Sequence, residues 1–394
     1  MLAFTGTSLL FLAPLLVSLA LKVEELVGIE AAPGRLALVT SIGSLLAIVA
    51  NPLFGRLSDR TTSAWGMRRP WMVVGLAGGS VGIVTIALAG DVAVVLLGWC
   101  LVQVFLNALL AALTAVLPDR VPPAQRGLVS GVLAVCLPVA SVAGTFLVQA
   151  FDRDLLTMLL VPWAVGVVLV LQFVGRLADR RLDAGRAPAW SVREFMSTFY
   201  VSPRRSPDFA WAFASRFLLV TAYAFLVTYQ AYYLLAQVGS RERDVPHAIF
   251  EGTLVQSATL VVVALVAGRL SDHLGRRKLF VLTAALVYAL ALFVIAGADD
   301  VHGYLLGMAL GGLGFGMYTA VDLALVVDVL PDPGQAAKDL GVLNIAGALP
   351  FSLAPAVAPA ILDLGGGSYR VLFTVAGASA IAGAVAILPV KGVR

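Results

Sequence analysis

Two ionisable side chains, Arg216 and Asp322, each lie inside a long apolar stretch, in WAFASRFLLV and MYTAVDLALVV respectively. A charged group is costly to keep in such surroundings, so both are candidate functional residues. An ionised carboxylate pairs with a guanidinium, and protonation removes that attraction. The two residues could therefore couple a bound proton to the making and breaking of an ion pair. The alternative is a static pair that only holds two helices in register.

Polar residues also recur at regular spacing within these long apolar stretches. Arg216, Tyr223 and Gln230 recur every seven residues, so they share one face of a helix. Gln103 and Asn107 lie four residues apart and share a face of another helix. Amides and tyrosines provide paired donors and acceptors and a flat apolar ring, which suits a neutral polyhydroxylated ligand. We predict a substrate site formed by Gln103, Asn107, Tyr223, Gln230 and Tyr318.

The apolar stretches that carry these residues are long enough to cross a membrane. The chain has 394 residues, is 60% hydrophobic and 13% charged, and has a mean hydropathy of +0.95. A water-soluble domain of this size needs more charge on its surface. One crossing takes about 20 residues of helix. We therefore predict twelve membrane-spanning helices, over residues 2–21, 34–55, 71–90, 92–117, 127–150, 155–175, 208–238, 247–270, 279–298, 302–330, 340–362 and 370–389.

The basic residues indicate the orientation of these helices. Of the 27 Lys and Arg, 20 fall in alternate loops, after the even-numbered spans and after the last one. This asymmetry follows the positive-inside rule. It predicts a protein of the cell membrane with both termini in the cytoplasm. The pI of about 9.2 therefore reflects membrane orientation and gives no support for nucleic-acid binding. Three tyrosines, Tyr229, Tyr232 and Tyr233, lie near the end of span 7 that faces away from the cytoplasm. They could either line the site or form an aromatic belt at the membrane interface.

A charged segment occurs twice. GRLSDRTTSAWGMRRPW begins at Gly55 and GRLSDHLGRRKLF begins at Gly268, 213 residues later. A second pair of similar segments has the same offset: LPDRVPPAQRG begins at Leu117 and LPDPGQAAKDLG begins at Leu330. Repeats in the same order indicate two homologous halves. We expect six-helix bundles over 1–175 and 208–394, joined by a polar cytoplasmic linker over 176–207. Within that linker, SVREFMSTF could form a surface helix or remain flexible.

The repeated segment could act as a conformational gate. An aspartate at the end of one span and arginines at the start of the next can hold neighbouring helix ends together in one conformation and release them in another. The alternative is that the charges only enforce orientation, which accounts for the arginines but not for the aspartates. The expected gate residues are Asp59, Arg60, Arg68, Arg69, Asp272, Arg276 and Arg277.

These segments resemble the signature loop of the major facilitator superfamily, Gly-x-x-x-Asp-Arg-x-Gly-Arg-Arg. The first copy, with its longer spacing and final Arg68-Arg69-Pro70, is similar to the sucrose-transporter and glycoside–pentoside–hexuronide branch. The resemblance implies that spans 1, 4, 7 and 10 line a central cavity. The chain departs from that branch because span 4 carries amides in place of a carboxylate. Proton coupling would then rest on Asp322, or on Glu251 near the outer end of span 8.

Taken together, these features predict an all-α integral membrane protein with twelve helices in two pseudo-symmetric bundles. The expected function is secondary active transport of a sugar or glycoside by proton-linked alternating access. The alternative is a proton-coupled efflux antiporter for amphipathic compounds. We expect no enzyme activity, no cofactor and no metal site, because no zinc, phosphate-loop or dinucleotide motif is present. The expected partners are a small solute, protons and the lipid bilayer, with the protein acting as a monomer.

Overall fold

The computed structural model describes residues 1–120, 133, 135–152, 154–179, 181, 203–204, 206–329, 342–343 and 345–391, and within these ranges it contains helices and no strand. The residue contacts divide the chain into two compact units, Met1–Trp190 and Ser191–Arg394. We call them unit 1 and unit 2. Their boundary lies inside the expected linker, residues 176–207. Most of that linker, including the expected surface helix, lies outside the described residues.

Unit 1 begins with one continuous helical stretch from Leu2 to Asp59. Its 58 residues would span about 87 Å at 1.5 Å per residue, more than twice the thickness of a bilayer core. Gly28 breaks the stretch with φ 75° and ψ 161°, a backbone conformation that glycine adopts without steric cost. The expected loop between the first two spans is therefore mostly helical. Two of its charges form an ion pair, in which Lys22 Nζ contacts Glu25 Oε2 at 2.8 Å.

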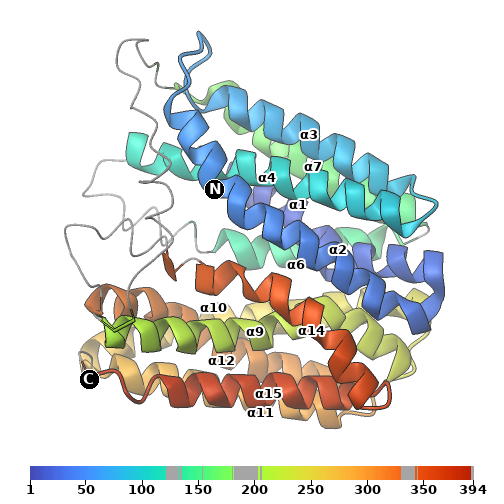
Figure 1. The fold of residues 1–394 in the computed structure, drawn as a ribbon, viewed down its shortest axis with the longest axis vertical. Coiled ribbons are helices and arrows are strands. Elements are labelled where there is room, and N and C mark those ends of the chain that lie inside the picture. Colours follow the sequence, from blue (N-terminus) through green and yellow to red (C-terminus); the bar gives the residue numbers. More distant parts are fainter. Residues whose placement is uncertain are drawn as a thin grey trace. The chain divides into compact units, whose positions relative to one another are not determined.

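The remaining helices of unit 1 follow in order along the chain (Figure 1). The unit contains α1 (Leu2–Ala13), the π-helical turn η1 (Pro14–Ser18), α2 (Leu19–Asp59), α3 (Arg69–Ala87), α4 (Val92–Arg120), α6 (Cys136–Ala150) and α7 (Leu155–Arg176).

Unit 2 has a corresponding series of long helices. It contains α9 (Pro207–Ala236), the short 3₁₀ turn η3 (Glu242–Asp244), α10 (Val245–Leu274), α11 (Arg277–Gly297), α12 (Val301–Asp328), α14 (Pro350–Leu364) and α15 (Tyr369–Ala386).

The two units pack their helices in the same pattern. In unit 1, α4 packs on α2 and α3, α1 packs on α6 and α7, and α7 also contacts α3 and α6. In unit 2, α12 packs on α10 and α11, α9 packs on α14 and α15, and α15 also contacts α11 and α14. Each of these contacts in unit 1 has its counterpart six spans later in unit 2. The internal repeat read from the charged segments therefore extends to the helix packing.

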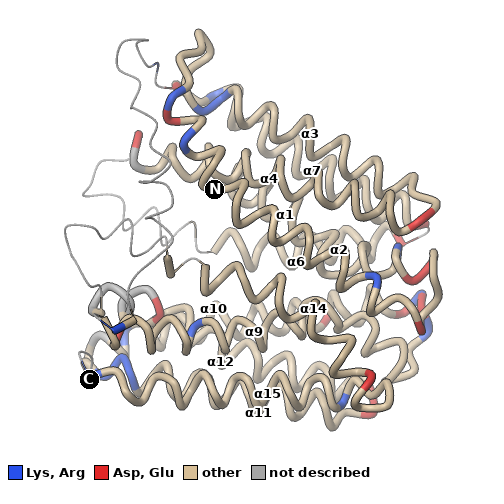
Figure 2. The backbone as a smooth tube through the Cα atoms, viewed as in Figure 1, with Lys and Arg blue, Asp and Glu red and all other residues tan. Residues whose placement is uncertain are grey.

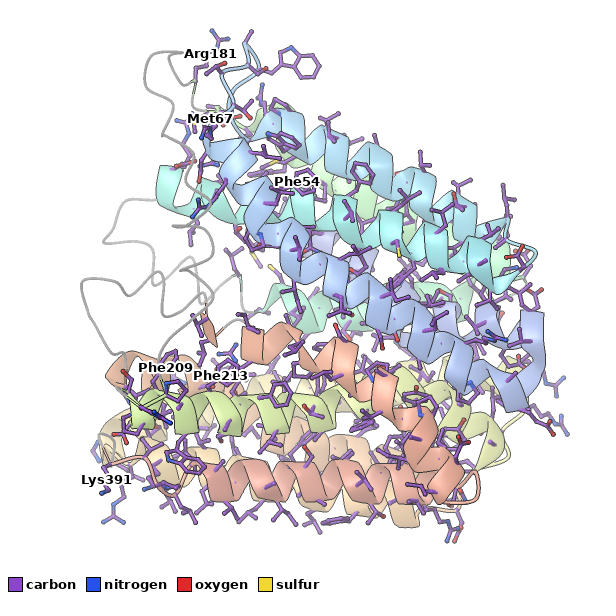
Figure 3. All side chains as sticks on the ribbon, in the orientation of Figure 1. Phe54, Met67, Arg181, Phe209, Phe213 and Lys391 are labelled. Atoms are coloured by element: carbon purple, nitrogen blue, oxygen red, sulfur yellow. The ribbon has the colours of Figure 1, made fainter. Side chains whose placement is uncertain are left out.

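Ten helices in the described residues are long and apolar enough to cross a membrane, the first being the stretch that is long enough for two crossings. A further apolar helix, Cys136–Ala150, is shorter. In both units most of the charged residues gather near helix ends, and long stretches between the ends carry none (Figure 2). Apolar side chains cover the outward faces (Figure 3), among them Leu88 at 71% and Val262 at 62% exposure. These surfaces suit a lipid environment, and the fold confirms the predicted all-α membrane class.

Close helix packing depends on glycine at specific contacts. A Cβ at Gly82 would lie 2.7 Å from the carbonyl oxygen of Gly98, and a Cβ at Gly98 would approach Gly82 equally closely. In unit 2, a Cβ at Gly316 would lie 2.6 Å from the carbonyl oxygen of Leu260. Small residues at such positions let backbones approach in a bilayer, where apolar side chains gain little by leaving lipid.

Candidate functional site

An ion pair lies in the interior of unit 2. Arg216 Nη1 of α9 donates to Asp322 Oδ2 of α12 at 2.7 Å. Their side chains are only 21% and 14% exposed, so the pair is largely desolvated. The sequence places these residues in two apolar stretches 106 positions apart, and the structure brings them together.

Two further residues surround this pair. Tyr318 precedes Asp322 by about one helical turn and is 4% exposed, and its Oη is buried with no hydrogen-bond partner among the described residues. Gly347 approaches from a third element, because a Cβ there would lie 3.4 Å from Arg216 Nη2. The guanidinium is therefore held by the carboxylate on one side and closely covered by backbone on another. A change in the charge of Asp322 would act on three helical segments at once.

Aromatic rings from four helices converge next to this pair. Tyr223 of α9 stacks on Phe315 of α12 with ring centroids 4.5 Å apart and an interplanar angle of 15°. Phe351 of α14 meets Tyr223 edge-on at 6.1 Å, and Tyr288 of α11 lies 6.5 Å from Tyr223. Tyr223, Phe315 and Phe351 are half-buried, whereas Tyr288 is fully buried. Of the two tyrosines predicted as substrate ligands, Tyr223 is therefore partly accessible and Tyr318 is buried.

Gln230 lies on the same face of α9 but is packed inside the unit. It is 2% exposed, and its Oε1 accepts a hydrogen bond from Tyr304 Oη at 2.9 Å. Tyr229, Tyr232 and Tyr233 are also fully buried. Tyr233 Oη, for example, donates to the carbonyl oxygen of Ile295 at 2.7 Å. These side chains hold helices of unit 2 together, so an aromatic belt facing lipid does not describe them.

The polar interior of unit 1 carries amides. Asn51 Nδ2 of α2 donates to Asn107 Oδ1 of α4 at 3.2 Å, and Asn107 Nδ2 donates to the carbonyl oxygen of Gln103 at 2.8 Å. Asn107 is half-buried. Gln103 is only 2% exposed and packs against Gly43 of α2, where a Cβ would lie 3.1 Å from its Cγ. Of the two residues predicted in span 4, Asn107 is the more accessible.

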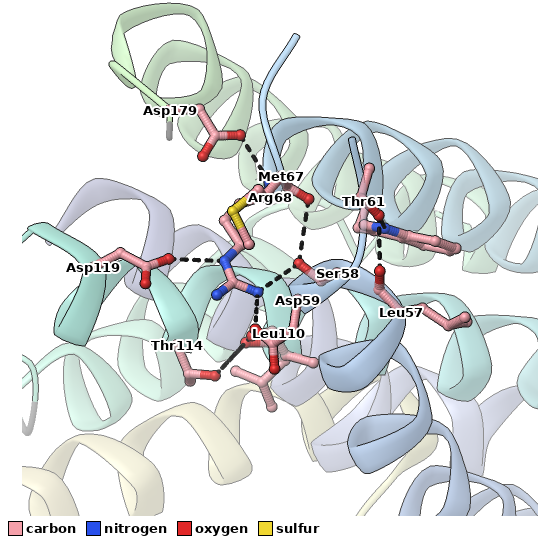
Figure 4. Close-up of polar contacts among 12 residues, drawn as sticks. Leu57, Ser58, Asp59, Thr61, Met67, Arg68, Leu110, Thr114, Asp119 and Asp179 are labelled. Carbon is pink, nitrogen blue, oxygen red and sulfur yellow. Dashed lines mark hydrogen bonds and ion pairs between the residues drawn. The ribbon is translucent and has the colours of Figure 1, made fainter. Parts of the chain in front are cut away.

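The charged segment of unit 1 forms a network around Arg68 (Figure 4). Arg68 Nη1 contacts Asp59 Oδ1 at 2.6 Å, and its Nε contacts Asp119 Oδ2 at 2.9 Å. Nη1 also donates to Ser58 Oγ at 2.9 Å. Burial by itself would lower the pKa of Arg68, but the hydrogen bonds and negative charges of Asp119 and Asp59 outweigh it and raise the pKa above its ordinary value. The network therefore joins the C-terminal ends of α2 and α4 to the start of α3.

Asp179, which follows α7, fixes the same loop through its backbone. Its Oδ2 accepts from the amide nitrogen of Arg68 at 2.7 Å (Figure 4) and from that of Arg69 at 2.9 Å, at the first turn of α3. Gly66 has φ 107° and lies directly against this carboxylate, so a side chain there would be strained and would displace it. Arg69 Nη2 also reaches the carbonyl oxygen of Gly175 at 3.5 Å.

Aromatic packing supports the turn. The ring centroid of Phe54, marked in Figure 3, lies 5.2 Å from that of Trp71, whose Nε1 donates to Thr61 Oγ1 at 2.7 Å.

Arg60, another expected gate residue, lies at the C-terminal end of α2, and its Nη1 has no hydrogen-bond partner among the described residues.

The corresponding segment of unit 2 is arranged differently. Gly275 turns the chain with φ 61°, and Arg276 is exposed, with no ion-pair partner among the described side chains. Arg277 begins α11 and is half-buried. Lys278 donates to the carbonyl oxygens of Leu388 and Val390, the latter at 2.8 Å, and so binds the chain that follows α15. The side chain of Asp272 lies outside the described residues.

Several residues of these networks were not predicted as site residues. Asp119 was marked by the sequence, because it lies in the repeated LPD segment, but the repeat did not indicate its partner. Asp179, Phe315 and Tyr288 carry no such signal. Asp179 is 111 residues from Arg68, and the two aromatics are ordinary residues of apolar helices. Only the packing of the helices brings them to these positions.

The comparison with known families decides the class of this protein. The sequence pattern of the Major Facilitator Superfamily matches residues 1–260 and 247–393. The chain belongs to the Major Facilitator Superfamily. It is therefore a transporter and not an enzyme, as predicted.

Solved structures of superfamily transporters share the fold. A mutant of the nucleoside transporter NupG aligns with a TM-score of 0.77 at 14% identity, over 99% of this chain and 100% of that one. A bacterial homolog of the human lysosomal transporter Spinster, inward-facing and unoccupied, gives 0.70 at 15% identity, over 98% and 94%. The human organic anion transporter MFSD10 (TETRAN) gives 0.70 at 19% identity, over 98% of each chain. At these identities the likeness concerns the fold alone.

One curated protein matches the chain over a limited region. The arabinose-proton symporter of Bacillus subtilis (strain 168) is 35% identical over 83 residues, which is 21% of this chain and 18% of the symporter. The chain therefore aligns with less than a fifth of the length of that relative.

Proposed function

We propose that this transporter moves a sugar or glycoside by proton-linked alternating access. The observation that carries the proposal is the desolvated ion pair between Arg216 and Asp322, which joins two helices of unit 2 at 2.7 Å. Protonation of Asp322 would cancel its charge and leave the guanidinium without its counter-ion. The two helices would then be free to change their packing, which is how a proton can drive a conformational change.

The neutral polar groups support a polyhydroxylated solute. Asn107 and Tyr223 are both half-buried and offer an amide and a phenol next to apolar surface. A ring face and paired donors and acceptors match the alternating polar and apolar surfaces of a sugar. The partial match to an arabinose-proton symporter supports the same solute class and the same coupling ion.

The network around Arg68 is proposed as the gate in this cycle. It joins the ends of α2, α3 and α4 in the conformation described, and its contacts would have to break or rearrange for those ends to separate. We also propose that residues 1–175 and 208–394 act as the two moving bundles, with 176–207 as the linker, and that a monomer suffices for transport.

The coupling is tested by solute uptake into vesicles that contain the purified full chain. Asp322→Asn should abolish accumulation driven by a pH gradient while preserving exchange of labelled solute at equal concentrations, because the amide cannot cycle a proton. Glu251→Gln is the matched control, since Glu251 is a more exposed carboxylate paired with His247 at 3.2 Å. Unchanged accumulation by Asp322→Asn would contradict the role of Asp322, and loss in Glu251→Gln alone would move it to that residue.

The solute class is tested by a binding screen with sugars, glycosides and lipophilic cations. Asn107→Ala and Tyr223→Ala should each weaken sugar binding several-fold, because each substitution removes a polar group from a partly accessible position. A screen in which only lipophilic cations bind would favour the amphipathic efflux antiporter instead.

The proposed orientation places both termini in the cytoplasm of a cell carrying the protein in its plasma membrane. Single cysteines introduced in a variant lacking Cys100 and Cys136 can report it. Trp65→Cys and His273→Cys should react with an impermeant reagent from the cytoplasmic side, and Leu364→Cys, at a position 91% exposed, from the other side. Labelling of positions 65 and 273 from opposite sides would overturn the two-bundle topology.

A further inference from the structure

The loop between α2 and α3 carries an exposed tryptophan on an ordered turn. Trp65 is 67% exposed. Its amide nitrogen donates to Ser63 Oγ at 3.1 Å, and the amide nitrogen of Gly66 donates to the carbonyl oxygen of Ser63 at 3.0 Å. Gly66 adopts φ 107°, a conformation that glycine reaches without steric cost. Because these contacts order the backbone on both sides of Trp65, the turn presents the indole outside the packed helices.

Three arginines lie close to this turn: Arg69, Arg176 and Arg181. Arg69 Nη2 reaches the carbonyl oxygen of Gly175 at 3.5 Å, so its guanidinium lies beside the last turn of α7. A Cβ on Gly66 would collide with the side chain of Asp179, so the chain that follows α7 runs against the turn. Arg181 follows two residues later, at the same end of unit 1 as Met67 (Figure 3). Arg176 and Arg181 are exposed, and Arg69 is half-buried.

The carboxylates nearby are already engaged. Asp59 and Asp119 both contact Arg68. Asp179 Oδ2 accepts from the amide nitrogens of Arg68 and Arg69. None of the three arginines forms an ion pair with a carboxylate in the part of the chain that the structure describes. Their positive charge is therefore available to an anion from outside the chain.

The height of these arginines on their helices fits the headgroup layer of a bilayer. The nearest exposed large apolar side chains on the same helices are Val74 of α3 and Leu171 of α7, at 42% and 47% exposure. Arg69 precedes Val74 by five residues and Arg176 follows Leu171 by five, so each lies about 7.5 Å further along its helix. The headgroup layer on each side of the hydrocarbon core is about 5–7.5 Å deep. The backbones of these arginines therefore lie at about the level of lipid phosphates.

We propose that this edge of unit 1 binds the headgroup of an acidic phospholipid, with Arg69, Arg176 and Arg181 on the phosphate and Trp65 beside it. Guanidinium groups bind phosphate through paired, charge-assisted hydrogen bonds. The indole combines an apolar ring with a polar N–H, which is why tryptophan is enriched at the membrane interface. Each basic residue near an acidic membrane surface strengthens binding about fivefold. The inference concerns the lipid partner and is independent of the transported solute.

The test measures the fluorescence of Trp65 in the full chain, reconstituted in nanodiscs of phosphatidylcholine. The chain has six tryptophans, so the Trp65 signal is taken as the difference between wild type and Trp65→Phe. Lipids with brominated acyl chains quench a tryptophan that they contact. We expect brominated phosphatidylglycerol to give half of the maximal quenching at a mole fraction at least fivefold lower than brominated phosphatidylcholine, because the phosphatidylglycerol is enriched at the three arginines.

Two double variants locate the preference. Arg176→Gln with Arg181→Gln should remove the preference for phosphatidylglycerol and leave quenching by brominated phosphatidylcholine unchanged, because the charges are lost and the indole remains. The matched control is Arg241→Gln with Arg243→Gln, which removes the same charge from two exposed positions of unit 2 and should leave the preference intact. All four positions are exposed, so the melting temperatures should change little.

Four results would overturn the proposal. A Trp65 signal that neither lipid quenches would show that the indole faces water, and equal quenching by the two lipids would show that no acidic headgroup is selected. A preference that persists in Arg176→Gln with Arg181→Gln would remove the arginines from the site. Equal loss of the preference in both double variants would assign it to net charge and not to this edge. None of these results bears on the proposed solute or on its coupling to protons.

Discussion

In unit 1 the charged side chains that meet lie at helix ends, where Arg68 joins Asp59 and Asp119. In unit 2, Arg370 likewise meets Asp299 at helix ends, but a further pair, Arg216 and Asp322, lies about 13 Å along α9 from its first residue. The helices of the two units pack in the same pattern. Among the side chains that the structure describes, unit 1 therefore holds its charge network at helix ends, whereas unit 2 also has an ion pair within the length of two helices.

The repeated segments show the same divergence. Arg68 is 5% exposed and contacts two carboxylates, whereas Arg276 in the second copy is exposed. The second copy binds through Lys278 to carbonyl oxygens of the chain that follows α15. Among the described side chains, the first copy thus holds its loop through an ionic network and the second through Lys278.

The largest effect is expected at the interior pair. Arg216→Met should destabilise the protein by about 3–5 kcal/mol, because it leaves Asp322 buried without a counter-ion. The double variant Arg216→Met with Asp322→Leu should regain most of the lost stability, since apolar residues can replace a buried pair at little cost. Thermal unfolding in detergent measures both.

The same double variant sharpens the contrast between a coupling pair and a static one. It should fail to accumulate solute under a pH gradient even where its stability is restored. Accumulation at the wild-type level would mean that the pair only holds α9 against α12, as the charge network of unit 1 holds its helix ends.

The next largest effect is expected at the first charged segment. Arg68→Ala should cost about 1.5–3 kcal/mol, the range for hydrogen bonds to charged groups, with the lower half favoured because Asp59 is 52% exposed. Arg276→Ala is the matched control from the second copy and should change stability by less than about 0.5 kcal/mol. Equal melting temperatures for the two variants would remove the distinction between the loops.

A smaller effect is expected where Asp179 holds the first turn of α3. Asp179→Ala should cost about 1 kcal/mol, as for loss of a helix cap. Hydrogen exchange should accelerate at the amides of Arg68 and Arg69, which donate to this carboxylate. Asp154→Ala, which removes the cap of α7 at Thr157, is the control and should affect exchange only near its own helix. Unchanged exchange at residues 68 and 69 would show that the loop is held without Asp179.

The smallest expected effect is the pH dependence of the Arg68 network on the alkaline side. The folded state raises the pKa of Arg68, so its stabilising effect is complete below the ordinary arginine pKa and is lost only as pH rises through the raised value. The difference in stability between wild type and Arg68→Ala should therefore stay constant from about pH 7 to 10. A difference that shrinks across that range would mean that another group controls the network.

The amino-acid sequence by itself determined the class of fold, because the bilayer sets both patterns that reveal it. Each crossing requires about 20 apolar residues, and Lys and Arg gather in the loops on one side of the membrane. It also marked Arg216, Asp322 and the repeated charged segments, since charges stand out against an apolar background.

Only the tertiary structure decided which groups meet. Gln230 was expected to face a ligand from its seven-residue spacing, yet it hydrogen-bonds Tyr304 inside the unit. Periodicity assigns a residue to a helix face but does not say which neighbouring helix covers that face. The partners of Arg68 and the stack of Tyr223 on Phe315 depend on contacts between residues far apart in the chain. Such contacts are set by how several helices pack together, which no local pattern encodes.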